Sequence, residues 1–160
     1  MDGLYYDEKK TFQINLSSAN WSTGDLHEIF GVIGNFLNDV DWITETENSL
    51  LLIEFKDYSK GEHRIDDKEK YYQNILSKYY GSAYFLFACG KKKPMDFILI
   101  VNSPLMDTVI GKRAEASIKK RLPFILQNNP EIPNQLINHF WILSISDWND
   151  RYPMFPLQQC

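Results

Sequence analysis

Two acidic residues and one lysine near the middle of the chain have the types and the spacing that metal-assisted phosphodiester chemistry requires. Asp41 precedes an apolar segment, and Glu54 and Lys56 lie two positions apart in the run LLLIEFKD. Side chains two positions apart in a strand lie on one face, so Glu54 and Lys56 share a face with Leu50 and Leu52. Because those leucines are apolar, we expect a buried strand that opens into a cleft at its end.

The spacing also predicts a hairpin over residues 39–56. A two-residue turn at 47–48 pairs residues whose numbers sum to 95, which places Asp41 opposite Glu54. The reverse face then carries Val40, Trp42, Thr44, Leu51, Ile53 and Phe55. A slip of one residue would mix the two faces, and burial of the apolar face disfavours it.

The carboxylates of Asp41 and Glu54, which the predicted register places opposite each other, repel each other, and something must offset this repulsion. Two such charges about 4 Å apart repel by about 4 kcal/mol at the effective dielectric of a protein surface. A divalent cation or a raised pKa would relieve this repulsion, and oxygen ligands favour Mg²⁺ or Mn²⁺. Three histidines, His27, His63 and His139, are too dispersed for a zinc site.

The pattern of Asp41, a gap and then Glu54-Phe55-Lys56 resembles the signature of the PD-(D/E)xK nucleases. The resemblance is specific over residues 39–57 and rests elsewhere on the order of elements. It implies a restriction-endonuclease-like fold and a metal bound by Asp41, Glu54 and the Phe55 carbonyl. It also implies that Lys56 positions or helps to deprotonate the attacking water. A bound metal lowers the pKa of its water and stabilises charge on the phosphate.

Three further residues are candidates for auxiliary roles at this site. Asp39 falls on the face of Asp41, opposite Lys56, either as a spare ligand or as the counter-ion of that lysine. Glu28 is the candidate for the acidic residue that many family members add from the first helix, although it points away from the apolar stripe. Gln73 could reach the site from the second helix, or it could be a helix-border residue without a role.

The elements around the hairpin predict an α/β fold: a single nuclease-like domain over residues 1–160, with three layers and a central mixed sheet flanked by helices. Strands are expected at 12–16, 39–45, 50–56, 82–88, 97–101 and 140–145, and helices at about 23–38, 66–80 and 105–127. The segments 82–88 and 97–101 are apolar at nearly every position, as strands covered on both faces are. The family core usually has three strands between its first and second helices, whereas the sequence indicates only two, unless the segment 12–16 takes the missing place.

Periodicity also indicates which side chains the helices bury. The first helix is expected to bury Leu26, Ile29, Phe30, Ile33 and Leu37. The second is expected to stop at Gly81. The third is expected to be disturbed at Pro123 and to turn Ala114, Ile118, Leu122 and Ile125 inward.

The composition excludes several classes of protein. With 44% hydrophobic and 14% aromatic residues, the chain is too apolar to be disordered. Its longest apolar runs fall far short of the ~20 residues that span a bilayer, so no membrane association is expected. The first ten residues lack an apolar signal core, and Cys89 and Cys160 form no disulfide framework. We therefore expect a cytoplasmic protein.

The net charge of −4 argues against binding of nucleic acid through overall charge alone, but the charged residues are unevenly distributed along the chain. The first 58 residues hold 11 acidic residues against three basic ones, whereas residues 91–121 are basic. The candidates for binding the nucleic-acid backbone are Lys91, Lys92, Lys93, Lys112, Arg113, Lys119 and Lys120. The alternative is that these residues form solvated helix faces.

The resemblance to the PD-(D/E)xK nucleases implies a nuclease dependent on Mg²⁺ or Mn²⁺ that hydrolyses DNA, with RNA left open as a substrate. A chain of this size has little room for a target-reading module, so a homodimer or a partner protein is expected to supply specificity. One alternative is a non-catalytic binding or regulatory domain that keeps the fold. Another is a general α/β domain whose hairpin carboxylates are salt-bridged to Lys56.

Overall fold

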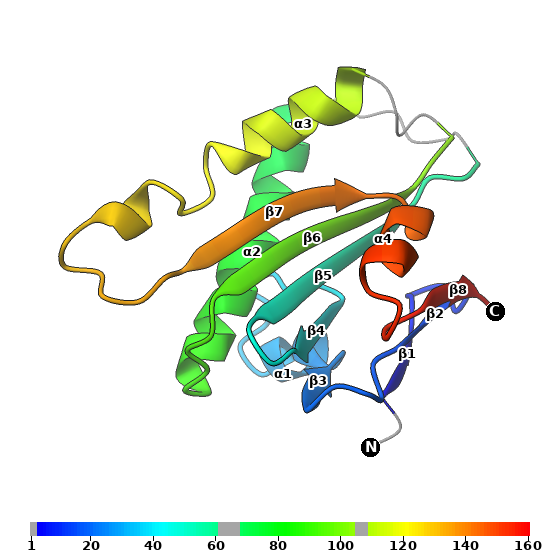
Figure 1. The fold of residues 1–160 in the computed structure, drawn as a ribbon, viewed down its shortest axis with the longest axis horizontal. Helices are drawn as coiled ribbons and strands as arrows, with labels where there is room; N and C mark the ends of the chain where they lie inside the picture. Colours follow the sequence, from blue (N-terminus) through cyan, green and yellow to red (C-terminus); the bar gives the residue numbers. More distant parts are fainter. Residues whose placement is uncertain (1–2, 61–67, 105–108) are drawn as a thin grey trace.

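A five-stranded mixed sheet forms the centre of the protein (Figure 1), and the computed structural model describes residues 3–60, 68–104 and 109–160. Its strands, in order across the sheet, are β3 (Trp21–Thr23), β4 (Trp42–Glu45), β5 (Leu50–Asp57), β6 (Met95–Asn102) and β7 (Ile137–Leu143). The first three are antiparallel neighbours, while β5, β6 and β7 run parallel. Parallel neighbours need long crossovers, which here contain helices.

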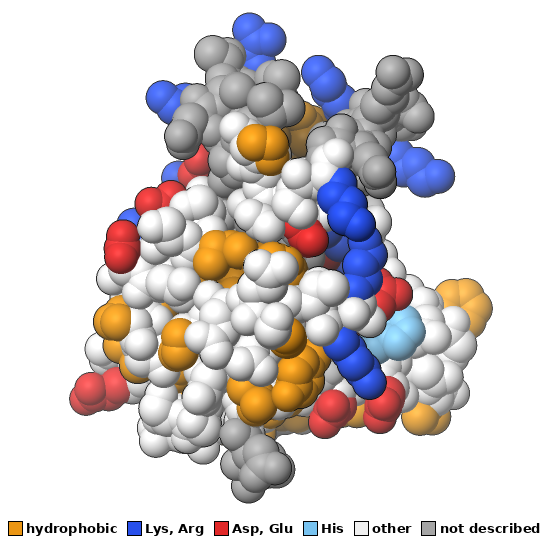
Figure 2. Space-filling view, turned by 90° about the vertical axis from the view of Figure 1, so that its right-hand side faces the viewer, with side chains coloured by type: hydrophobic (Ala, Val, Ile, Leu, Met, Phe, Trp, Pro, Cys, Tyr) orange, Lys and Arg blue, Asp and Glu red, His pale blue; other side chains and the backbone are white. Residues whose placement is uncertain are grey.

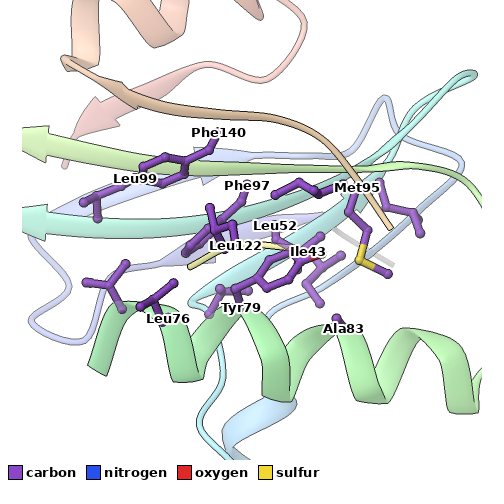
Figure 3. Close-up of a cluster of buried hydrophobic side chains, with 14 of the residues drawn as sticks. Ile43, Leu52, Leu76, Tyr79, Ala83, Met95, Phe97, Leu99, Leu122 and Phe140 are labelled. Atoms are coloured by element: carbon purple, nitrogen blue, oxygen red, sulfur yellow. The ribbon is translucent and has the colours of Figure 1, made fainter. Parts of the chain in front are cut away.

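Helices cover one face of this sheet. The helix α2 (Lys68–Ala88) connects β5 to β6, α3 (Val109–Lys119) connects β6 to β7, and the short α1 (Leu26–Gly31) precedes the hairpin. Figure 3 shows Leu76, Tyr79 and Ala83 of α2 directed at the strands. The even-numbered residues Leu50 and Leu52 of β5 are buried in this core.

A smaller sheet and the last helix cover the reverse face. The small sheet has the order β1 (Leu4–Tyr6), β2 (Phe12–Asn15) and β8 (Leu157–Gln159), and the helix is α4 (Ile145–Arg151). The odd-numbered residues Leu51, Ile53 and Phe55 of β5 pack in this second core with Trp148 of α4. The observed architecture is therefore an α/β fold with two sheets, in which β5 is buried on both faces.

The hairpin has the predicted register. Trp42 pairs with Ile53 and Glu45 pairs with Leu50, so paired numbers sum to 95. The turn at 47–48 is closed by a hydrogen bond from the Thr46 backbone N–H to the Ser49 carbonyl oxygen at 2.8 Å. The predicted division of β5 between two faces is confirmed.

The predicted strand at 82–88 is wrong, because these residues form the second half of α2. Gly81 does not end the helix. A Cβ at this position would lie 1.9 Å from the Asn38 carbonyl oxygen, so the glycine permits close packing inside the helix. A short run that is apolar at every position does not distinguish a buried strand from a buried helix. The predicted start of this helix, at residue 66, lies outside the described residues.

The region before the hairpin also differs from the prediction. The helix expected over 23–38 is limited to residues 26–31, and residues 21–23 form β3, which the sequence did not reveal. Leu26 and Phe30 are buried as expected, but Ile29 and Ile33 are 45% and 52% exposed. The segment expected at 12–16 forms β2 of the small sheet, so β3, not β2, is the third antiparallel strand beside the hairpin.

The two strands predicted after α2 are present, but the bounds of the second and the element that follows it differ from the prediction. The predicted strand at 97–101 is β6, and the one predicted at 140–145 is β7, which ends at Leu143. The hydroxyl of Ser144 then accepts a hydrogen bond from the Asp147 N–H and caps α4, which was not predicted.

The third helix is shorter than expected. It ends at Lys119, and residues 105–108 of its predicted start lie outside the described part of the chain. Ile118 and Leu122 are buried as predicted, whereas Ile125 is 80% exposed, because after Pro123 the chain turns into the 3₁₀ helix η1 (Leu126–Asn128). Among the described helices, none is long and apolar enough to cross a membrane.

Candidate active site

Asp41 lies immediately before β4 and is tied to the neighbouring strand. Its Oδ2 accepts a hydrogen bond from the Phe55 backbone N–H at 2.8 Å. The preceding residue is held by α2, where the buried Ser82 hydroxyl accepts a hydrogen bond from the Val40 N–H at 3.0 Å. The close approach of this segment to α2 requires the glycine at position 81. The helix after the hairpin therefore positions Asp41.

Glu54 is fully buried and lies between two lysines. Its Oε1 is 2.6 Å from Nζ of Lys56 and 2.9 Å from Nζ of Lys78. Its Oε2 has no hydrogen-bond partner among the described residues. A buried carboxylate oxygen without a partner has lost its hydration without compensation.

Lys78 was not predicted from the sequence. It lies in α2, and its side chain is only 18% exposed. One signal could have indicated it: Lys78 is three residues after Ile75 and four before Ser82, both of which are buried on the sheet-facing side of the helix. A lysine within such a stripe needs an acidic partner.

Burial and charge shift the proton equilibria of Asp41 and Lys56. Burial, followed by the nearby charge of Glu54, raises the pKa of Asp41 from 3.8 to about 7, against the lowering effects of the Phe55 N–H and of both lysines. Burial by itself would lower the pKa of Lys56, but the charge and hydrogen bonding of Glu54 and the charge of Asp41 raise it overall. Lys56 is therefore an ammonium group, which can bind an anion but is a poor base.

A pocket of about 480 Å³ opens beside Asp41, Phe55 and Lys56. The rest of its wall comes from the turn between β1 and β2, from the last residue of β5 and from the segment after it: Asp7, Glu8, Lys9, Thr11, Asp57, Tyr58, Ser59 and Lys60. Asp7 holds that turn, since its Oδ1 accepts hydrogen bonds from the N–H groups of Thr11 and Phe12, both at 2.7 Å. Glu54 does not line the pocket.

The donor set suits a hard cation that keeps several waters. Asp41 and the unpartnered Oε2 of Glu54 supply two carboxylates, which with a backbone carbonyl and substrate oxygens match the coordination of Mg²⁺ or Mn²⁺. Within the described ranges, no group of three or more His, Cys, Asp and Glu residues is arranged to hold a metal ion. The residues present thus fit a weakly held divalent cation that is completed by water.

Asp39 does not serve as the counter-ion of Lys56, because the ion-pair partner of Lys56 is Glu54. Its carboxylate instead lies 3.4 Å from Nδ1 of His27. The reason is that β4 begins only at Trp42, so the strand pairing that would place Asp39 opposite Lys56 does not extend so far.

Glu28 and Gln73 are both exposed, and neither lines the pocket. Glu28 projects from α1, while the Gln73 amide Nε2 lies 3.4 Å from Oε1 of Glu69, one turn earlier in α2. The structure therefore does not bring these two predicted auxiliaries to the site.

The predicted nucleic-acid-binding lysines are divided between two places. Lys91 and Lys93 form ion pairs with Glu45 at 2.6 and 3.1 Å, at the turn end of the hairpin and away from Glu54. The others are exposed: Lys92, Lys112, Arg113, Lys119 and Lys120. On the face shown in Figure 2, a row of Lys and Arg side chains has acidic side chains beside it. That face therefore presents charges of both signs.

Comparisons of the chain with protein-family models, with curated proteins and with solved structures give no match. A function can therefore be inferred only from the geometry of Asp41, Glu54, Lys56 and the pocket beside them.

Proposed function

We propose that the protein is a metal-dependent nuclease that hydrolyses phosphodiester bonds of DNA at the site formed by Asp41, Glu54 and Lys56. The observation that carries this proposal is that Oε2 of the buried Glu54 has no partner within residues 3–60, 68–104 and 109–160. The charge of Glu54 also raises the pKa of Asp41. Burying a carboxylate oxygen without a partner costs stability. Such a residue is explained best by a cation that binds both carboxylates during function.

The topology supports the resemblance to the PD-(D/E)xK nucleases. The hairpin β4–β5 is followed by the crossover helix α2 and by β6, which pairs parallel to β5. A third antiparallel strand, β3, lies beside the hairpin, but it precedes α1, whereas the three strands of that family usually lie between its first and second helices. A restriction-endonuclease-like core is therefore part of this proposal.

The chain's own residues would divide the chemistry between them. Asp41, Glu54 and the Phe55 carbonyl would hold Mg²⁺ or Mn²⁺, which when bound acts as a Lewis acid towards the phosphate and its water. The Lys56 ammonium lines the pocket and would stabilise negative charge that develops on the phosphate. The raised pKa of Lys56 favours this electrostatic role over proton abstraction. The pocket volume lies in the range of about 300 to 1,000 Å³ typical of ligand sites.

One observation favours a second function class, a non-catalytic binding or regulatory domain. Two ammonium groups already offset the charge of Glu54, so the cluster of Lys56, Glu54 and Lys78 can also act as a structural link between β5 and α2. A protein of this class would need neither metal nor substrate at the site.

A cleavage assay separates the two classes. The purified protein is incubated with single-stranded, duplex and branched DNA and with RNA, in Mg²⁺ or Mn²⁺. The wild type should cleave, and Glu54→Gln and Lys56→Met should each lose about 100-fold or more in rate. Glu45→Gln is the matched control, because Glu45 also pairs with two lysines but at the other end of the hairpin. It should keep wild-type activity.

Cleavage that survives both Glu54→Gln and Lys56→Met would rule out this site. An absence of cleavage in all substrates, together with a melting temperature that Mn²⁺ does not raise, would favour the non-catalytic domain. Circular dichroism of each variant shows whether a loss of activity reflects unfolding.

A further inference from the structure

Lys78 is the charged residue of the site that the hairpin motif does not explain. Its ammonium lies 2.9 Å from Oε1 of Glu54, and it reaches this oxygen from α2, across the space between helix and sheet. Glu54 is its ion-pair partner in the described part of the chain. A lysine that is only 18% exposed and packed above a buried carboxylate has lost most of its hydration.

The two lysines at Glu54 differ in their surroundings. Lys56 lines the pocket, so it lies on the side of the site that a substrate would occupy. Lys78 does not line the pocket, and it extends from a separate element on a flexible four-carbon stem. Of the two, Lys78 is the one that can leave Glu54 without disturbing the substrate-facing side.

The charges of the cluster oppose cation binding. Glu54 carries one negative charge and the two lysines carry two positive charges, so this group of three has a net charge of +1. Both ammonium groups contact Oε1, which leaves Oε2 for another ligand. A divalent cation at Oε2 would be repelled by both lysines at short range.

We propose that Lys78 is a resident counter-ion of Glu54, which a divalent cation displaces when it binds. The inference rests on the proposed function, because it requires a metal at Asp41 and Glu54. In the metal-free protein Lys78 stabilises the buried charge of Glu54, so the site forms without metal. Metal binding is then an exchange of one cation for another, and the affinity is reduced by the free energy of displacing Lys78.

Removing the Lys78 charge should change the metal affinity in one direction if Lys78 is exchanged for the cation, and in the opposite direction if Lys78 only supports the site. Removal of the Lys78 charge should tighten metal binding, because the cation no longer competes with it. A residue that only supports the site would weaken metal binding when it is removed.

The test titrates metal-free protein with Mn²⁺ alone and follows binding by calorimetry and by the rise in melting temperature. In Lys78→Met the Mn²⁺ concentration at half-saturation should fall about tenfold or more, while the melting temperature without metal should also fall. Lys78→Arg keeps the charge and should bind Mn²⁺ like the wild type.

Lys91→Met is the matched control. Lys91 is also partly buried and pairs with a glutamate, Glu45, at 2.6 Å, but it lies at the other end of the hairpin. Its substitution changes the net charge equally and should leave the Mn²⁺ affinity unchanged. If Lys78→Met does not fold, Lys78→Gln removes the same charge with a polar side chain and should show the same direction.

The outcomes separate the two proposals. Equal or weaker Mn²⁺ binding by Lys78→Met, with a wild type that binds Mn²⁺, would overturn the exchange and leave the metal site standing. Mn²⁺ binding by Lys78→Met but not by the wild type would overturn the exchange, because it would show that the cation does not displace Lys78 from the wild-type site. Binding by neither protein would overturn both the exchange and the metal-dependent function.

Discussion

The raised pKa of Asp41 makes the stability of the metal-free protein depend on pH. Burial and the charge of Glu54 raise this pKa from 3.8 to about 7. Below the lower value Asp41 is protonated in both the folded and the unfolded chain. Between the two values only the unfolded chain releases the proton, so the free energy of unfolding falls as the pH rises. The shift of about three units corresponds to a loss of about 4 kcal/mol above pH 7.

The substitution Asp41→Asn tests this effect, because asparagine can still accept the hydrogen bond from the Phe55 N–H but does not titrate. Urea denaturation of both proteins from pH 5 to pH 8 gives the free energies of unfolding. Over that interval the wild type should lose about 2.5 kcal/mol relative to Asp41→Asn, since part of the 4 kcal/mol is already lost at pH 5.

The matched control is Asp25→Asn, which removes an exposed carboxylate just before α1. It should follow the wild type at every pH. A difference between wild type and Asp41→Asn that stays constant from pH 5 to pH 8 would refute the reasoning. Saturating Mn²⁺ should reduce the loss in the wild type, because a bound cation stabilises the ionised carboxylate.

Two further predictions concern stability. Gly81→Ala should lower the free energy of unfolding by about 2 kcal/mol, although alanine normally stabilises a helix interior by about 1 kcal/mol, because its Cβ would overlap the Asn38 carbonyl. Gly31→Ala, whose Cβ would meet its nearest neighbour at 3.8 Å, should cause no loss, and equal urea midpoints for the two variants would contradict this account. Glu54→Ala should lower the free energy of unfolding by about 3 kcal/mol in the same assay, because two ammonium groups lose their partner. A smaller loss than that of Glu45→Ala would contradict this prediction.

The hairpin shows how far local sequence rules extend. A two-residue turn and the alternation of side chains fix both the register and the faces of the strands, and these rules involve only neighbours in the chain. They correctly predicted that Trp42 pairs with Ile53 and that Glu54 faces away from Phe55. They could not show where β4 begins, so the role of Asp39 was misjudged.

The elements around the hairpin were predicted less well, because their limits depend on distant contacts. A glycine at position 81 is typical of a helix end, but the structure shows that it is needed because Asn38 packs against it. The run 82–88 reads equally well as a buried strand or a buried helix, and only its position against Phe30 and the sheet decides for the helix. Ile29 and Ile33 follow helical spacing, yet the helix ends before the second of them.

The sequence by itself determined that Glu54 and Lys56 lie side by side at the end of a buried strand, with Asp41 across the hairpin from them. The tertiary structure decided that Lys78 also contacts Glu54 and that the turn of residues 7–11 lines the pocket. It also decided that Asp41 is buried, which raises its pKa to about 7. The physical reason is distance along the chain. Strand alternation is a local property, whereas the contact between residues 54 and 78 exists only because α2 crosses back over the sheet.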